Sequence, residues 1–79
     1  MEFSATMLET IATMRQHGDL IRYDGGFWSW KNVELKPLYI GGKFLCNVPV
    51  WHCDVKTLRA LNRRGIVTLD EVHKVCTLN

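Results

Sequence analysis

The sequence has no long apolar run. No stretch approaches the ~20 consecutive apolar residues that a membrane-spanning helix needs. The N-terminus also lacks the basic region and apolar block of a secretory signal. We therefore expect a cytoplasmic protein with no membrane partner.

The chain has only three cysteines, and their pattern argues against two common roles. The three cysteines are an odd number, and intracellular thiols normally stay reduced, so no disulfide framework is expected. Cys46, His52, Cys53, His73 and Cys76 contain enough soft ligands for a zinc site. However, there is no Cys-x-x-Cys pair, and adjacent residues of an extended segment point to opposite faces. We expect separate thiols, with no metal and no cofactor.

Catalytic motifs are also missing. The chain has no glycine-rich loop of the kind that holds phosphates, and Gly25-Gly26 and Gly41-Gly42 have the sequence of turns. Nothing places an orienting acid or an oxyanion hole beside a Cys/His pair. We therefore expect a binding protein and not an enzyme.

The composition is that of a small folded domain. The chain has 79 residues, of which 47% are hydrophobic and 23% charged, and we expect residues 1–79 to form one domain with a thin core.

The net charge of +2 is unevenly distributed. Residues 1–49 hold equal numbers of acids and cations, whereas residues 55–64 hold four cations and no acid. This local basic patch is an argument about which partners the protein binds, and it says nothing about the fold.

The first third of the chain predicts a helix followed by a β-hairpin. The helix begins after Ser4 or Thr6, buries Leu8, Ile11 and Met14 with Met7 beside them, and ends at Gly18. Residues 20–30 then predict two short strands joined at Asp24-Gly25-Gly26.

The rest of the chain predicts irregular strands, a second helix and a second hairpin. Residues 34–53 contain two prolines and a Gly-Gly pair, which suit strands or a long ordered loop. Asp54 and Gly65 bound a helix from Val55 to about Arg64. For residues 66–79 a hairpin turning around residues 70–73 is favoured over a short third helix. The expected fold class is therefore α+β.

The helix over residues 55–64 is amphipathic, with a basic stripe beside its apolar face. Together with RRGIV and the strand KVCTLN, it resembles the second half of a winged-helix domain, in which a recognition helix enters the major groove and a two-stranded wing touches the backbone. The resemblance implies DNA contacts from Lys56, Thr57, Arg59, Asn62 and Arg63 on the helix and Lys74 on the wing. Arg64, beside the terminating glycine, either joins these contacts or caps the helix. The segment CNVPVWHC departs from the family, because a supporting helix is expected there.

A second resemblance covers more of the chain. The order of its motifs is similar to that of small uncharacterised proteins of bacteriophages and prophages. These motifs are a helix ending at His17-Gly18, then Arg22, GGFW at 25–28, a long loop, and TLRALNRRGI at 57–66. It implies either a DNA-binding transcription regulator or an inhibitor of a host protein complex, of anti-CRISPR type. DNA is the leading partner and a host protein the alternative, with the oligomeric state open.

The tryptophans of the first hairpin form a further candidate surface. Trp28 and Trp30 alternate with Phe27 and Ser29, so both indoles share one face of the strand. We favour their burial in the core. If exposed, they would stack on single-stranded nucleic acid or anchor a protein partner.

Overall fold

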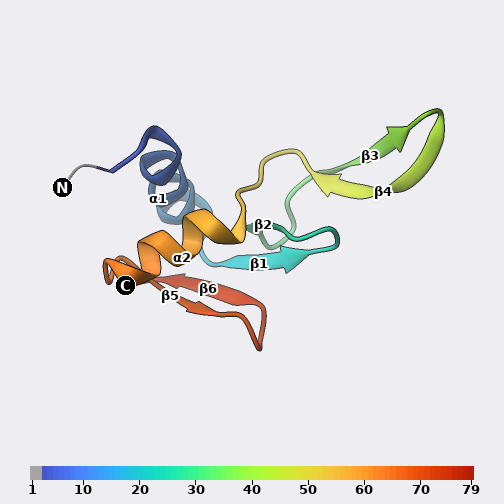
Figure 1. Ribbon diagram of the computed structural model, residues 1–79. Helices are drawn as coiled ribbons and strands as arrows, with labels where there is room; N and C mark the ends of the chain where they lie inside the picture. Colours follow the sequence, from blue (N-terminus) through green and yellow to red (C-terminus); the bar gives the residue numbers. More distant parts are fainter. Residues whose placement is uncertain (1–2) are drawn as a thin grey trace.

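The computed structural model describes residues 3–79 and contains two helices and six strands in that range (Figure 1). This confirms the expected α+β class. The elements, in chain order, are α1 (Ala5–His17), β1 (Leu20–Tyr23), β2 (Phe27–Trp30), β3 (Leu35–Ile40), β4 (Lys43–Pro49), α2 (Val55–Arg63), β5 (Val67–Asp70) and β6 (Val75–Leu78).

The central sheet has four antiparallel strands in the order β2-β1-β6-β5. It joins the first hairpin to the last one by pairing Leu20 with Cys76. The predicted C-terminal hairpin is confirmed, and Asp70 stabilises its turn because Oδ1 accepts the N–H groups of Val72 and His73 at 3.1 and 3.0 Å. Thr68 lies in β5 and does not cap a third helix.

Helix α1 begins at the first of its two candidate caps. The Ser4 hydroxyl accepts the N–H of Met7 at 3.2 Å. The predicted inner face is partly wrong, because Leu8 is 54% exposed, whereas Thr10 is buried beside Met7 and Met14. Thr10 can be buried because its hydroxyl donates to the carbonyl of Thr6 at 2.8 Å, which satisfies its polar atom.

Helix α2 has the predicted caps. Asp54 Oδ1 accepts the N–H of Thr57 at 2.9 Å, and this hydrogen bond lowers the pKa of Asp54. At the other end Gly65 has φ +74°. The Gly65 N–H donates to the Asn62 carbonyl at 3.0 Å, and the Ile66 N–H donates to the Leu61 carbonyl at 3.1 Å. This pair of hydrogen bonds is a Schellman motif. The helix therefore ends at Arg63, with Arg64 as its cap.

The core lies between the two helices and the central sheet. Leu58 and Leu61 of α2 are fully buried, as the helical period predicts. They belong to one cluster with side chains from α1, β1, β2, the segment before α2, β5 and β6, which are Met7, Met14, Leu20, Trp28, Cys53, Val67 and Cys76.

Strands β3 and β4 form a separate hairpin that projects from the body (Figure 1); we call residues 35–49 the arm. The arm contributes to an elongated shape of 43 × 25 × 21 Å. Its pairing shifts register between Leu38 and Tyr39. Residues 34–53 were expected to be strands or ordered loop, and strands occupy most of them. Because the arm stands where a winged-helix domain has its supporting helix, that part of the resemblance is not met.

Candidate nucleic-acid interface

Helix α2 turns its two fully buried leucines inward and leaves Lys56 and Arg63 exposed. Neither cation has an ion-pair partner among residues 3–79. Thr57 is partly buried, and its N–H is used by the Asp54 cap. Asn62 is exposed, and its side-chain oxygen accepts the N–H of Leu69 at 3.4 Å. Of the predicted helix contacts, Lys56 and Arg63 are therefore best placed to meet an anion.

Arg59 lies on the same helix but has a carboxylate partner. Its Nη2 lies 2.7 Å from Oε1 of Glu71, and its Nε donates to Oε2 at 3.2 Å. The guanidinium lowers the pKa of Glu71, because two hydrogen bonds favour the carboxylate. Glu71 is in the β5–β6 turn, and helical periodicity alone could not reveal this partner. The charge of Arg59 is thus neutralised within the chain.

The remaining predicted cations lie at opposite ends of α2. The Arg64 guanidinium lies 4.7 Å above the centre of the Phe3 ring, which places it at the helix end. Lys74, in the turn before β6, has φ 59° and an exposed side chain. Its carbonyl accepts the N–H of Arg22 at 3.2 Å, so strand pairing brings these two cations together. Sequence reasoning did not place Arg22 at this site.

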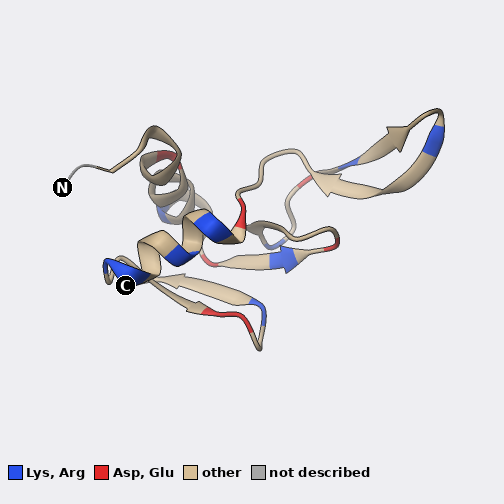
Figure 2. Ribbon diagram, in the orientation of Figure 1, with Lys and Arg blue, Asp and Glu red and all other residues tan. Residues whose placement is uncertain are grey.

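Figure 2 shows the distribution of these charges. Lysine and arginine positions follow α2, and further cations lie at the neighbouring end of β1 and at the start of β6. The acid that precedes α2 and the two acids of the last hairpin are engaged locally. Asp54 caps α2, Asp70 stabilises the turn and contacts His73 at 2.7 Å, and Glu71 holds Arg59. We call Arg22, Lys56, Arg63 and Lys74 the basic face.

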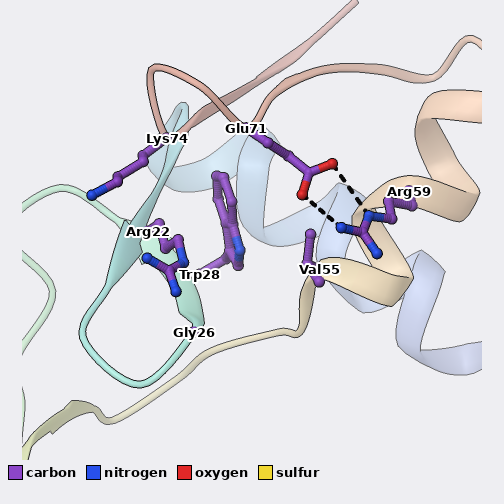
Figure 3. A pocket seen from close by; sticks show the side chains of 7 residues that line it. All are labelled: Arg22, Gly26, Trp28, Val55, Arg59, Glu71 and Lys74. Carbon is purple, nitrogen blue, oxygen red and sulfur yellow. Dashed lines mark hydrogen bonds and ion pairs between the residues drawn. The ribbon is translucent and has the colours of Figure 1, made fainter.

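A cavity of about 330 Å³ opens beside the basic face (Figure 3). Its walls come from β1, the β1–β2 turn, β2, α2 and the last turn, through Arg22, Gly26, Trp28, Val55, Arg59, Glu71 and Lys74. In Figure 3 the Trp28 indole stands between the Arg22 side chain and the wall formed by Val55 and Arg59. The cavity therefore unites three predicted site residues, Trp28, Arg59 and Lys74, with Arg22 and Glu71.

Trp28 belongs to the core and not to an exposed platform. It is 1% exposed, and its indole N–H has no hydrogen-bond partner in the part of the chain that the structure describes. A buried donor without a partner costs about 1–3 kcal/mol. Trp30 is partly buried and stacks on His17, with ring centres 3.7 Å apart, and on Trp51, with centres 5.9 Å apart. A stacking surface for nucleic acid or a protein partner required both Trp28 and Trp30 to be exposed. Because Trp28 is buried, the two indoles do not form that surface.

The thiols and histidines do not converge. Within residues 3–79, no group of three or more His, Cys, Asp or Glu side chains is arranged to hold a metal ion. Cys53 and Cys76 are buried in the core, whereas Cys46 is half-buried in the arm. Burial raises the pKa of Cys53 to about 12 and that of Cys76 to about 11. Both thiols therefore stay protonated near neutral pH.

Comparison with known proteins returns no relative. No protein-family model, curated protein or solved structure matches this chain. The winged-helix and phage-protein resemblances stay predictions. In the part of the chain from residue 3 onward, neither helix is long and apolar enough to cross a membrane.

Proposed function

We propose that this protein binds nucleic acid through the basic face and acts as a small regulator of phage or mobile-element type. One observation carries the proposal. Arg22, Lys56, Arg63 and Lys74 are exposed and lack ion-pair partners within residues 3–79, while the nearby acids Asp54, Asp70 and Glu71 are engaged locally. Exposed cations of this kind bind phosphates and release counterions from the duplex.

The order of the elements supports a helix-led contact. Helix α2 is followed directly by the β5–β6 hairpin, as in the recognition helix and wing of the family it resembles. A helix fits the major groove of B-form DNA, and Asn62 presents an exposed amide on the same helix. In this proposal Lys56 and Arg63 contact phosphates beside the groove, and Arg22 and Lys74 contact the backbone from the wing end.

Neutralising the two unpaired cations of α2 should weaken DNA binding. In Lys56→Gln/Arg63→Gln the loss of two phosphate contacts should reduce the slope of log affinity against log salt by about 1.8 units, or about 0.9 per contact. Fluorescence anisotropy with a labelled duplex measures this slope.

The matched control is Lys31→Gln/Lys36→Gln, which removes the same charge from exposed positions outside the basic face. It should leave the slope close to that of the unaltered protein. Equal losses in both double variants would mean that net charge alone, and not this face, governs binding.

The arm favours a second candidate function, inhibition of a host protein. Five of its large apolar side chains are between 45% and 62% exposed, namely Leu35, Tyr39, Ile40, Phe44 and Leu45. A two-stranded hairpin is marginally stable in water, and an exposed apolar surface of this kind is typical of an interaction site. Residues 35–49 also carry Lys36 and Lys43 and no acid. The complementary partner is a protein with an apolar groove bordered by carboxylates.

The two candidates respond differently to changes in the arm. Tyr39→Ser/Phe44→Ser removes two exposed rings whose centres lie 5.8 Å apart, so it should abolish capture of a protein partner that survives nuclease treatment. The same variant should leave duplex binding unchanged. Loss of duplex binding with no loss of protein capture would exclude this role of the arm.

A further inference from the structure

The cavity beside the basic face has the composition of an anion site. Arg22 and Lys74 carry two positive charges that have no ion-pair partner within residues 3–79, and the third cation, Arg59, is balanced by Glu71. Arg22 and Trp28 are paired across β1 and β2, so their side chains share one face of the sheet. The hydrogen bond from the Arg22 N–H to the Lys74 carbonyl places the backbone of Lys74 beside that of Arg22, and both side chains line the cavity. The wall is therefore positively charged and held by paired strands.

Glu71 already places an anion against this wall. Its two oxygens face Nε and Nη2 of Arg59, which is the forked geometry that a guanidinium also offers to phosphate. The two side chains are 55% and 48% exposed, so the pair can open without disturbing the core. A phosphate carries the same acceptor chemistry as this carboxylate, with more oxygens to contact Arg22 and Lys74.

The buried indole provides an independent sign of a missing acceptor. Trp28 lines the cavity and is 1% exposed, and its indole N–H has no hydrogen-bond partner among residues 3–79. Because the nitrogen itself has almost no exposed surface, an acceptor reaches it only when a neighbouring side chain moves. Arg59 and Glu71 line the same cavity and are half-exposed, so their side chains can move without unfolding the core.

We propose that the cavity receives a phosphate group, which replaces Glu71 as the partner of Arg59, contacts Arg22 and Lys74, and accepts the indole N–H of Trp28. Glu71 then acts as an internal competitor that occupies the site when no phosphate is bound. Where the phosphate belongs to a polynucleotide backbone, the inference rests on the proposed function. Free phosphate shares the chemistry, and the experiment distinguishes the two sources.

The test is an NMR titration of the full chain that follows its three indole N–H signals. Inorganic phosphate and a short DNA duplex are added separately at low salt. The Trp28 signal should move in a saturable way with at least one of them, while the signals of Trp30 and Trp51 serve as internal references. Trp51 already donates to Glu9 at 2.7 Å and lies outside the cavity.

Two variants move the affinity in opposite directions. Glu71→Gln removes the competing charge and should tighten binding roughly threefold to tenfold, which a purely structural Arg59–Glu71 pair would not do. Arg22→Gln/Lys74→Gln should weaken binding at least about tenfold, since it removes the two cations of the basic face that line the cavity. Arg15→Gln, an exposed cation on α1 that does not line this cavity, should match the unaltered protein.

Each outcome assigns or excludes the site. If the Trp28 signal responds to inorganic phosphate and the protein does not bind the duplex, the cavity is a phosphate site and the proposed function is wrong. If the Trp28 signal responds to the duplex, the bound phosphate belongs to a polynucleotide. The inference is overturned if Trp28 responds to neither probe, or if Glu71→Gln weakens binding. It is also overturned if Arg15→Gln weakens binding as much as Arg22→Gln/Lys74→Gln.

Discussion

Leu61→Ala is expected to lower the free energy of unfolding by about 2–5 kcal/mol. Leu61 is fully buried in the core cluster, and its carbonyl accepts the Ile66 N–H that ends α2. The truncation therefore leaves a cavity where the helix meets the sheet. A chain of this length has a total stability of roughly 4–12 kcal/mol, so the variant should lose a large part of it.

Urea unfolding followed by tryptophan fluorescence measures this loss. The matched control is Leu8→Ala, since Leu8 is the same residue type on α1 but is 54% exposed. Its unfolding free energy should change by no more than about 0.5 kcal/mol. If the two variants lost equal stability, the described division between the core and the exposed side of α1 would be wrong.

The two core thiols should be almost inert in the folded protein. With pKa values of about 12 for Cys53 and about 11 for Cys76, roughly one molecule in ten thousand and one in a thousand carry the reactive thiolate at about pH 8. Unfolding returns both groups to an ordinary pKa near 8.5. Their reaction with a thiol-specific disulfide reagent should therefore be at least about a hundredfold slower in buffer than in urea, with half-buried Cys46 reacting first. Fast reaction of all three cysteines in buffer would contradict the described core.

The same thiols set the direction of the alkaline pH dependence. Burial raises their pKa on folding, so their contribution to stability is complete below about pH 8.5 and is lost as the pH rises toward the folded values. The expected loss is about 1.4 kcal/mol per pH unit for each thiol over that range. A Cys53→Ala/Cys76→Ala variant should lack this component in urea unfolding curves. An identical alkaline slope in both proteins would contradict the assignment.

Local signals in the sequence predicted the helices and hairpins well. Asp54, Gly65 and Ser4 act on backbone groups within a few residues, so their hydrogen bonds follow from spacing alone. The inner face of α1 was harder to predict. Thr10 replaces Leu8 at the core because a backbone carbonyl one turn earlier satisfies its hydroxyl, and hydrophobicity alone does not reveal that contact.

The candidate site depends on contacts between distant segments, and the sequence predicted only part of it. Helical periodicity placed Lys56, Arg59 and Arg63 on one stripe of the helix, and all three are exposed. The role of Arg22 follows from the pairing of β1 with β6, for which no sequence signal was available. Glu71 neutralises Arg59 because the last turn folds back beside α2. The projection of the arm likewise follows from packing and not from its strand propensity.

The salt dependence of duplex binding tests the central claim most directly. Anisotropy titrations of the unaltered protein between about 50 and 200 mM salt should give a slope of log affinity against log salt of about −3.6, or about −0.9 for each of the four cations of the basic face. This corresponds to a fall in affinity of roughly a hundredfold over that range. A slope near zero, or no binding by the folded protein at about 50 mM salt, would contradict nucleic-acid binding through this face.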